Sequence, residues 1–458
     1  MKLRRALALL LCTCMAGGML AGCGEKKTGG EGVETVTFWS VNAHSKATYE
    51  RMINEFNQTT GKDLGVFIDY QIKEGGSIVQ NLELALANGT APDLFTSGNI
   101  ANLAPEGKLI AIEDLPGGPE LVAKFSDNLT EFMHTYDGKT YTLPYGNTVQ
   151  GLIYNKDMFK AAGIVDENGE AKPPVTYDEM IEVAKKLTNP DKKEYGIILP
   201  FKWSGWASSD IVSPTRASVG HKGYDPKTGT WDFTVIEPVI NAYYQMQQDG
   251  SVYPGGEAIE NDQARALFAA GGVGMKIGFS FDVGVLNDQF PAEIDWGVAP
   301  LPVLDANNTY KQEGSVGGTY MMNADALKHL SGEQLIKILE FFVSDKFVQE
   351  AYKDCVDLPL SFDTVKDVVI ENPKKGWEDF AKLTSISANW YVEPEIDKTA
   401  FDSLDVVILR DVMSGKKTAK EVLAEYQANF DKAVEAYKND STKKPIEEYM
   451  IPELDPTR

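Results

Sequence analysis

Thr35-Val36-Thr37-Phe38-Trp39-Ser40 is a run of β-branched and aromatic residues, a composition typical of a β-strand. A helix is predicted after it, from Ser45 to about Thr59, with Gly61 just beyond its end at a C-cap position. The apolar residues of that helix fall on one face, and they are Tyr49, Met52, Ile53 and Phe56. A strand at 66–70, a helix at 78–88 and a short strand at 92–95 follow. This order predicts an α/β fold with a parallel sheet and helices on both faces.

The rest of the chain mixes extended and helical segments without an internal repeat. Residues 138–154 are typical of two extended segments broken by Pro144 and Gly146. Thr176 is placed to cap a helix over 177–187. Further extended segments are expected at 195–198, 273–278, 294–302 and 317–322, and further helices at 237–248, 261–270, 332–342, 345–352, 401–412 and 418–437.

The N-terminus has the pattern of a targeting segment. A basic start, residues 1–5, precedes an uncharged apolar run over 6–20 that is too short for an ordinary membrane span. Leu20-Ala21-Gly22-Cys23 resembles the bacterial lipobox, which implies lipidation of Cys23 and removal of residues 1–22 as a signal peptide. The alternative is a plain secretory peptide cut near Ala21. Residues 23–34 are then a lipidated cysteine and a glycine-rich, flexible tether.

Composition narrows the possible partners. The 458-residue chain carries a net charge of −23, and loss of residues 1–22 takes this to −26. Such a charge argues against binding nucleic acid or anionic lipid, whose phosphates would be repelled. Without Cys12, Cys14 and Cys23 only Cys355 remains, so no intramolecular disulfide is expected. The four histidines are widely spaced, and we expect neither a metal site nor a cofactor.

Eight stretches together resemble the extracellular solute-binding proteins of bacterial ABC importers, specifically the family 1, maltodextrin-type sugar binders. Gly138–Tyr145 with Leu152–Lys156 is the most specific match, and Pro174–Met180 differs from the usual helix start in having Tyr177 where tryptophan is common. The resemblance covers nearly all of the mature chain, and the other stretches are the lipobox with its tether and Val36–Trp39, and then Gly89–Phe95, Leu109–Ile112, Gly297–Pro302, Leu339–Tyr352 and Val412–Ala433.

The resemblance implies a two-lobed periplasmic-binding-protein-like fold of the class II type, with a central cleft and about three hinge crossings. We place the crossings near Pro144–Gln150, Lys276–Phe281 and Gly317–Met322, where glycine or proline suits a hinge rotation. The first lobe is expected to be 35–147 plus 279–319, and the second 148–278 plus 320–458.

The candidate ligand-binding residues are aromatic rings for the apolar face of a sugar and polar side chains for its hydroxyls. Trp203 and Trp206 lie in a glycine- and serine-rich turn where the family often has stacking residues, with packing under a loop as the alternative. Trp39 ends the first strand, and open α/β sheets bind ligands at the carboxyl ends of strands. The remaining candidates are His44, Ser97, Asn99, Asn147, Gln150, Phe279, Phe281, Asp282, Tyr320, Trp390 and Tyr391.

The expected function is therefore capture of a carbohydrate, an oligosaccharide, and its delivery to a membrane permease that works with a cytoplasmic ATPase. The protein is expected to be a monomer on the outer face of the bacterial membrane, held there only by its lipid. The same fold binding a polyamine or a glycerol phosphate is the alternative. A glycoside hydrolase, which needs a carboxylate pair, and a surface adhesin are weaker rivals, and no catalytic motif such as G-x-S-x-G or H-E-x-x-H is present.

Overall fold

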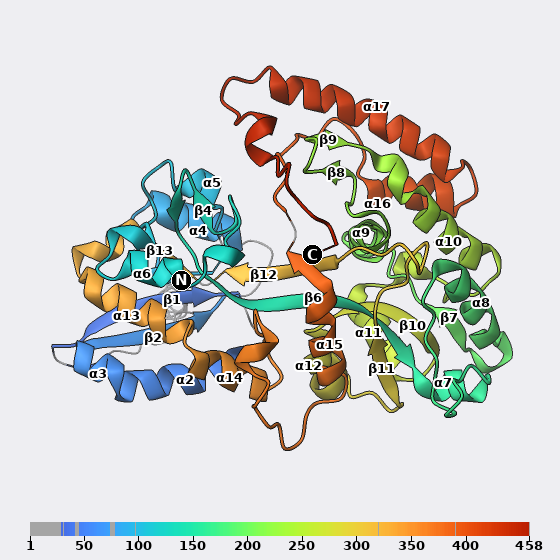
Figure 1. The fold of residues 1–458 in the computed structure, drawn as a ribbon, viewed down its shortest axis with the longest axis horizontal. Helices are drawn as coiled ribbons and strands as arrows, with labels where there is room; N and C mark the ends of the chain where they lie inside the picture. Colours follow the sequence, from blue (N-terminus) through green and yellow to red (C-terminus); the bar gives the residue numbers. More distant parts are fainter. Residues whose placement is uncertain are drawn as a thin grey trace, which may run out of the picture.

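A computed structural model describes residues 29–30, 32–41, 45–73, 78–96, 98–318, 320–389 and 391–457 of the chain. Four residues that carry predictions lie outside the described residues: Cys23, His44, Ser97 and Trp390. The fold is mixed α/β and has two lobes that lie side by side, with strands β6 (Pro144–Asn155) and β12 (Gln312–Gly318) running between them (Figure 1).

The first lobe is built on a four-stranded sheet in the order β13-β3-β1-β2. The predicted strands β1 (Glu34–Ser40), β2 (Val66–Ile72) and β3 (Leu94–Phe95) pair in parallel, as expected, and β13 (Met321–Met322) is antiparallel to β3. Successive strand residues point to opposite faces, so Leu94 packs with Val36 and Phe38 in one buried core and Phe95 packs in another.

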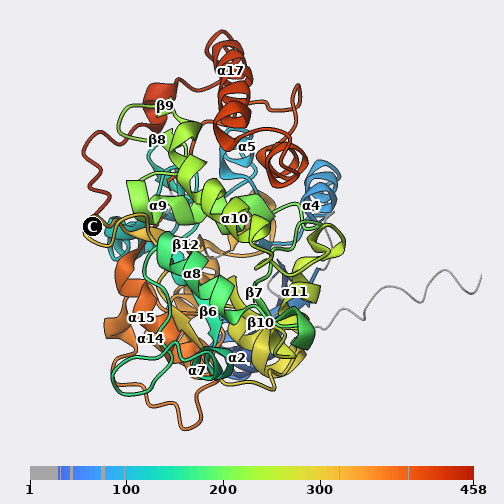
Figure 2. The same cartoon turned by 90° about the vertical axis from the view of Figure 1, so that its right-hand side faces the viewer.

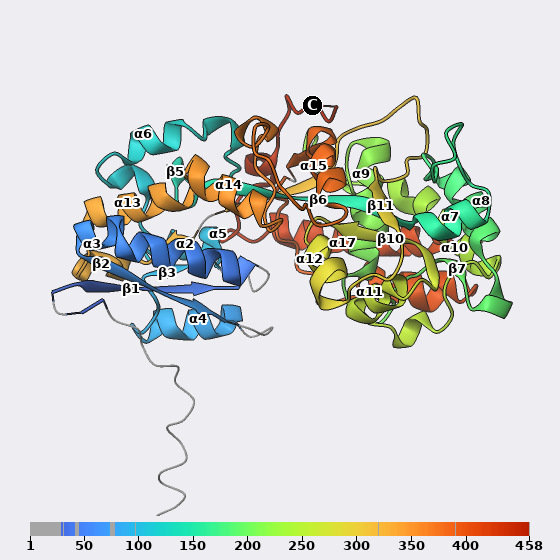
Figure 3. The same ribbon diagram turned by 90° about the horizontal axis from the view of Figure 1, so that it is seen from below.

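Helices cover both faces of this sheet (Figure 3). One face carries α2 (Lys46–Gln58), α3 (Thr60–Leu64), α13 (Gly332–Phe342) and α14 (Asp345–Lys353), and the other carries α4 (Ile78–Ala87) and α5 (Ile100–Leu103). The helix α6 (Gly118–Ala123) and the hairpin of β4 (Thr135–Tyr136) and β5 (Lys139–Thr140) complete the lobe. The expected C-cap at Gly61 is wrong. The chain continues from α2 into α3, and the helical segment is capped at Gly65, which has a left-handed φ of 68°.

The second lobe contains a six-stranded sheet in the order β14-β12-β6-β10-β7, with β11 paired to β6. Its strands are β7 (Tyr195–Ile197), β10 (Val273–Phe279), β11 (Trp296–Ala299) and β14 (Ser387–Asn389), besides β6 and β12. One buried core contains Leu152 and Met275, and a second buried core contains Ile153 and Val273.

The second lobe also contains most of the helices, and Figure 2 shows it from the side, with α17 above the hairpin β8–β9 and α10. The helices are α7 (Lys156–Ala161), α8 (Tyr177–Leu187), α9 (Ser213–Val219), α10 (Glu237–Gln248), α11 (Asn261–Ala269), α12 (Asp282–Gly284), α15 (Trp377–Leu383), α16 (Leu404–Val407) and α17 (Ala419–Lys438). The hairpin consists of β8 (Tyr224–Asp225) and β9 (Thr230–Trp231). None of the helices in the described part of the chain has both the length and the apolar composition needed to cross a bilayer.

β6 and β12 connect the lobes as an antiparallel pair. The first half of β6 pairs with β12, and its second half pairs with β10 and β11. The register of β12 shifts between Gly317 and Gly318. The expected crossing segments 144–150 and 317–322 therefore fall on these two strands and on β13.

The expected crossing at 276–281 and the expected lobe boundaries differ from the structure. Strand β10 pairs with β6 and β7 inside the second sheet and does not leave it. Because β11 pairs with β6, residues 279–311 stay with the second lobe. Because β13 pairs with β3 and α13 packs on the core around Phe38, residues 320–353 return to the first lobe.

Candidate functional site

A cavity of about 490 Å³ lies between the lobes. The first lobe lines it with residues 98–101, Phe132, Met133 and Met321, and the second lobe lines it with 392–396, Lys398 and Tyr449. The first-lobe wall begins where β3 ends and α5 starts, so it stands at the carboxyl edge of the parallel strands, the usual ligand edge of such sheets.

Asn99, one of the predicted residues, lies in this wall. It caps α5, since its side-chain oxygen accepts a hydrogen bond from the Asn102 N–H at 3.3 Å. Its side chain is exposed, so the amide group still has hydrogen-bonding capacity for a ligand.

The second-lobe wall contributes charge and a hydrogen-bond network. Glu393, Glu395 and Lys398 all line the cavity, and Glu393 Oε2 accepts a hydrogen bond from Trp231 Nε1 at 3.3 Å. The same cavity is lined by Phe132 and Tyr449, whose rings stack with their centroids 4.4 Å apart. The cavity thus combines aromatic faces with polar groups from both lobes, the mixture that a polar solute with an apolar face requires.

A second aromatic pair lies at the carboxyl end of β10, where Phe279 and Phe281 were predicted. The two rings stack at 5.2 Å with an angle of 10° between their planes, and the Arg265 guanidinium lies 5.6 Å from the Phe281 ring. Asp282 holds the backbone of Phe279 and the side chain of Arg265. It is 1% exposed, and it accepts the Phe279 N–H at 3.0 Å and pairs with Arg265 at 2.5 Å.

Two further ionisable groups are buried in the same part of the second lobe. Burial raises the pKa of Asp210 to about 7, although the nearby Lys276 ammonium acts in the opposite direction. Burial lowers the pKa of Lys276, against the attraction of Asp282 and Asp210. Lys276 Nζ donates to the Ile277 carbonyl at 2.7 Å. The opposite charges of these groups attract each other inside the second lobe. None of them is among the described residues that line the cavity between the lobes.

Three other predicted residues lie on strands, Trp39 on β1 and Asn147 and Gln150 on β6. Trp39 is half-buried, with Lys73 Nζ 4.5 Å from its ring centroid. Asn147 lies on β6, and its Oδ1 is buried with no hydrogen-bond partner among the residues that the structure describes. Gln150 is 1% exposed and already engaged, because it donates to the Ser209 carbonyl at 2.6 Å and accepts from Ser213 Oγ at 3.1 Å.

Several predicted aromatic residues pack inside the lobes, and for Trp203 and Trp206 this packing is the alternative to stacking on a solute. Trp206 is 1% exposed and lies edge-on to Phe201 at 4.7 Å. Tyr320 is 2% exposed and lies edge-on to Phe38 at 5.3 Å in the first-lobe core. Tyr391 is buried and donates to the Tyr224 carbonyl at 3.2 Å. Trp203 packs, partly buried, against the second-lobe core.

The sequence reasoning missed the cavity residues that come from loops and from the C-terminal end of the chain. Phe132 precedes the β4–β5 hairpin, and Tyr449 lies more than ten residues beyond α17. The only local signals were that Phe132 is an aromatic residue a few positions before the Asp137-Gly138 turn and that Tyr449 is an aromatic residue in a charged tail. Neither pattern indicates that the two rings meet.

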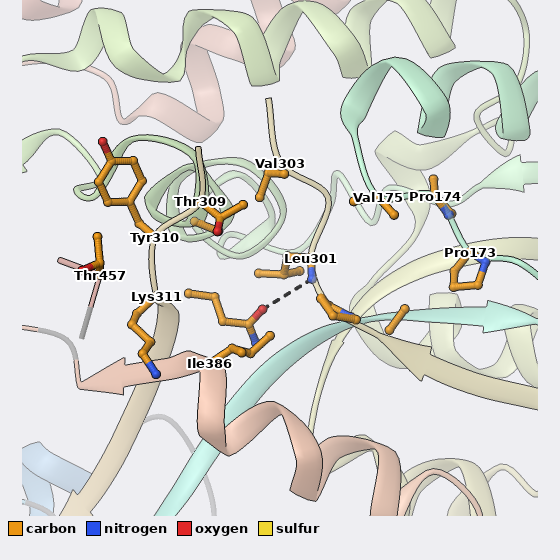
Figure 4. Close-up of a pocket in the computed structure, with 14 residues that line it drawn as sticks. Pro173, Pro174, Val175, Leu301, Val303, Thr309, Tyr310, Lys311, Ile386 and Thr457 are labelled. Carbon is orange, nitrogen blue, oxygen red and sulfur yellow. Dashed lines mark hydrogen bonds between the residues drawn. The ribbon is translucent and has the colours of Figure 1, made fainter. Parts of the chain in front are cut away.

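Another cavity, of about 470 Å³, lies entirely in the second lobe and is shown in Figure 4. It is lined mainly by apolar side chains, among them Pro173, Val175, Leu301 and Val303, with Tyr310 and Thr457 at one side. Among the residues that the structure describes, none from the first lobe lines this cavity, so movement of the lobes would leave it unchanged. In the described part of the chain, no three His, Cys, Asp or Glu side chains gather as a metal site would require.

Two α/β lobes with a cavity lined by residues of both lobes are typical of a protein that binds a small solute. Residues 42–346 match the family model of the bacterial extracellular solute-binding proteins, and the chain belongs to this family. Its members are binding proteins, and the resemblance inferred from the eight stretches is confirmed.

Among its relatives is the maltotriose-binding protein of Pyrococcus abyssi, 26% identical over 294 residues, which are 64% of this chain and 59% of the relative. The sn-glycerol-3-phosphate-binding periplasmic protein of Brucella abortus is 27% identical over 263 residues, 54% of this chain and 55% of that protein. The alignments thus span less than two thirds of the length of these two relatives.

Solved structures match nearly the whole chain. The GacH receptor of Streptomyces glaucescens has a TM-score of 0.67 at 20% identity, covering 89% of this chain and all of the receptor (100%). The maltodextrin-binding domain of Bdellovibrio bacteriovorus, bound to maltotriose, has a TM-score of 0.65 at 18% identity, covering 88% and 100% of the two chains. The two-lobed fold expected from the sequence is confirmed by these matches.

Proposed function

We propose that this protein is the lipid-anchored receptor of an ABC importer, and that it captures an oligosaccharide between its lobes and presents it to the membrane permease. The observation that carries the proposal is the cavity between the lobes, to which both lobes contribute aromatic and polar groups. A solute that touches both walls is bound best when the lobes hold one relative position, so binding shifts the lobes toward that position.

The chemistry of the cavity favours a neutral polyhydroxy solute. The charged groups among the described lining residues are two carboxylates, Glu393 and Glu395, and one ammonium group, that of Lys398. A phosphate ester would favour an excess of cationic groups or a glycine nest, so the glycerol-phosphate specificity of the Brucella relative fits these residues less well. The maltotriose specificity of the Pyrococcus relative fits stacked rings beside an amide and carboxylates. A polyamine would also use carboxylates and aromatic rings, and it stays the alternative.

A ligand screen tests the solute class. The protein is heated with mono- and oligosaccharides, polyamines and glycerol phosphates, and the unfolding midpoint is recorded. A solute at 100 times its Kd adds about 2.7 kcal/mol to the free energy of unfolding. We expect the shift with an oligosaccharide. A shift with polyamines or glycerol phosphates alone would reject the carbohydrate, and consumption of the sugar over time would reject the binding protein.

Hydrogen exchange locates the solute. A saccharide between the lobes should slow amide exchange in 98–101 and in 392–398 together, whereas a ligand in the cavity of Figure 4 would protect 299–312 and leave those two segments unchanged. Asn99→Ser keeps an N-cap but removes the amide, and it should weaken binding by about three- to tenfold. Asn102→Ala, on the exposed side of the same helix, is the matched control and should bind like the wild type.

A further inference from the structure

The segment that follows α17 is attached to one lobe and contacts the other. We call residues 444–456 the C-terminal strap. In Figure 1 this segment, in red, leaves α17 and runs back toward the junction of the lobes. Its attachment is to the second lobe. Tyr437 Oη donates to the Lys444 carbonyl at 2.8 Å, Ile446 belongs to the second-lobe core, and the Ile451 N–H donates to the Pro226 carbonyl at 2.7 Å.

The strap nevertheless contacts the first lobe. Tyr449 stacks on Phe132 with 4.4 Å between the ring centroids and 23° between the planes. Lys444 Nζ lies 4.7 Å from the Phe132 ring and 4.1 Å from the Tyr136 ring. An ammonium group above two aromatic rings is a favourable cation–π arrangement, and the stacked pair adds its own attraction.

The first-lobe side of this contact is held in place by an uncommon backbone conformation. Phe132 has a φ of 65°, a left-handed value that bulky residues rarely adopt and that persists only where the surroundings hold it. Its N–H donates to the Thr135 carbonyl at 2.7 Å, and the hairpin is tied to the lobe by the Thr140 N–H, which donates to Glu113 at 2.9 Å. The Phe132 ring is thereby directed at the strap.

We propose that the C-terminal strap is a latch that sets how far the two lobes open. The strap moves with the second lobe and the hairpin with the first, so their ring contacts exist only at one lobe separation. The contacts therefore stabilise that separation against wider opening. Phe132 and Tyr449 also line the cavity between the lobes, so opening the latch would open the way to this cavity. A role of the latch in solute entry rests on the proposed function.

Small-angle scattering without any solute tests the latch. The full chain is used with Cys23→Ala in every sample, so that no lipid is present. Tyr449→Ala removes the stacked ring, and Lys444→Gln removes the cation while it keeps most of the stem. Each should lower the ratio of latched to open molecules by about two- to tenfold, and this appears as a larger radius of gyration. Faster amide exchange in 130–137 should accompany it.

Two matched controls separate the latch from local packing. Tyr449→Phe keeps the stacked ring, and Lys443→Gln changes the exposed neighbour of Lys444, so both should scatter like the wild type. An unchanged radius of gyration in both Tyr449→Ala and Lys444→Gln would overturn the latch. Because no solute is present, this result is independent of the ligand screen, and a protein that binds no saccharide still shows whether the latch exists.

Discussion

His134 shows how one buried side chain links the stability of the protein to pH. It is fully buried, at 0% exposure, and its Nδ1 accepts the Thr130 N–H at 3.1 Å, which requires the neutral ring. Burial lowers the pKa of His134 from 6.5 to about 4. Between these values the unfolded chain binds a proton that the folded chain does not, so the free energy of unfolding falls as pH falls from about 6.5 to about 4.

We expect this histidine to contribute at most about 3 kcal/mol of that acid-induced loss. Urea denaturation at pH 7, 5 and 4 measures it, with His134→Asn as the comparison, because carboxylates elsewhere also titrate in this range. The two proteins should converge in stability toward pH 4. If the free energy of unfolding fell equally in both proteins between pH 7 and pH 4, His134 would titrate normally in the folded protein.

Trp206 tests whether a residue predicted to bind the solute serves the core instead. Its ring is 1% exposed and packs against Phe201, so Trp206→Ala should lower the free energy of unfolding by about 3–5 kcal/mol. Trp203→Ala removes a partly buried ring and should cost less. Chemical denaturation gives both values. A stable Trp206→Ala protein that has lost saccharide binding would restore the stacking role.

At the residue scale, the sequence predicted the kind of side chain better than its direction. Asn99 follows the short strand expected at 92–95 and lies in the cavity wall, and its place beyond the carboxyl end of β3 follows from strand order alone. Trp203 and Trp206 share one turn, and no periodic pattern in a turn says which ring points inward. Tyr320 was placed in the wrong lobe because the return path of the chain was misread.

Single elements were predictable because their signals are local. Thr176 caps α8 as expected, with its Oγ1 accepting the Glu179 N–H at 3.2 Å, and the four apolar residues of α2 are all buried. Pairing between distant strands is not local. The sequence of β10 looks like that of a hinge, with glycines at 274 and 278. Those glycines instead allow close packing, since a Cβ at Gly274 would come within 2.6 Å of Leu187.

The contact between β7 and α8 provides a prediction at the scale of elements. A Cβ at Gly196 would lie 2.3 Å from the Ala184 carbonyl oxygen and 2.4 Å from its Cα, both of them backbone atoms that cannot turn aside. Gly196→Ala should therefore push the helix from the sheet and lower the free energy of unfolding by about 1–3 kcal/mol.

Gly284 is the matched control for that substitution. A Cβ there meets no atom within 4 Å in the described part of the chain, and the residue ends α12. Gly284→Ala should leave the stability unchanged or raise it by up to about 1 kcal/mol, because alanine restricts the unfolded chain. Denaturant titrations that give equal values for both substitutions would contradict the proposed packing.

At the scale of the molecule, the sequence predicted two lobes but not their boundaries. Two of the expected crossing segments coincide with β6 and with β12–β13, where Pro144 and the Gly317-Gly318 pair mark irregular strands. The assignment of 279–319 and 320–353 was reversed. Helix α13 carries a capping box that gives its start, but nothing in its own sequence says which of two similar apolar cores it covers.

The attachment of the whole molecule to the membrane is the last prediction. The body would carry a net charge of −26 once residues 1–22 are removed, so anionic lipid should repel it and the proposed lipid on Cys23 must supply the binding. Cys23→Ala, made in a protein from which residues 1–22 are removed so that their apolar run cannot hold a membrane, should be found in the soluble fraction and should not sediment with phosphatidylglycerol vesicles. Cys355→Ala, which changes a buried thiol, should keep the wild-type distribution. Continued sedimentation of the Cys23→Ala protein would show that the protein surface itself binds lipid, against the sign of its charge.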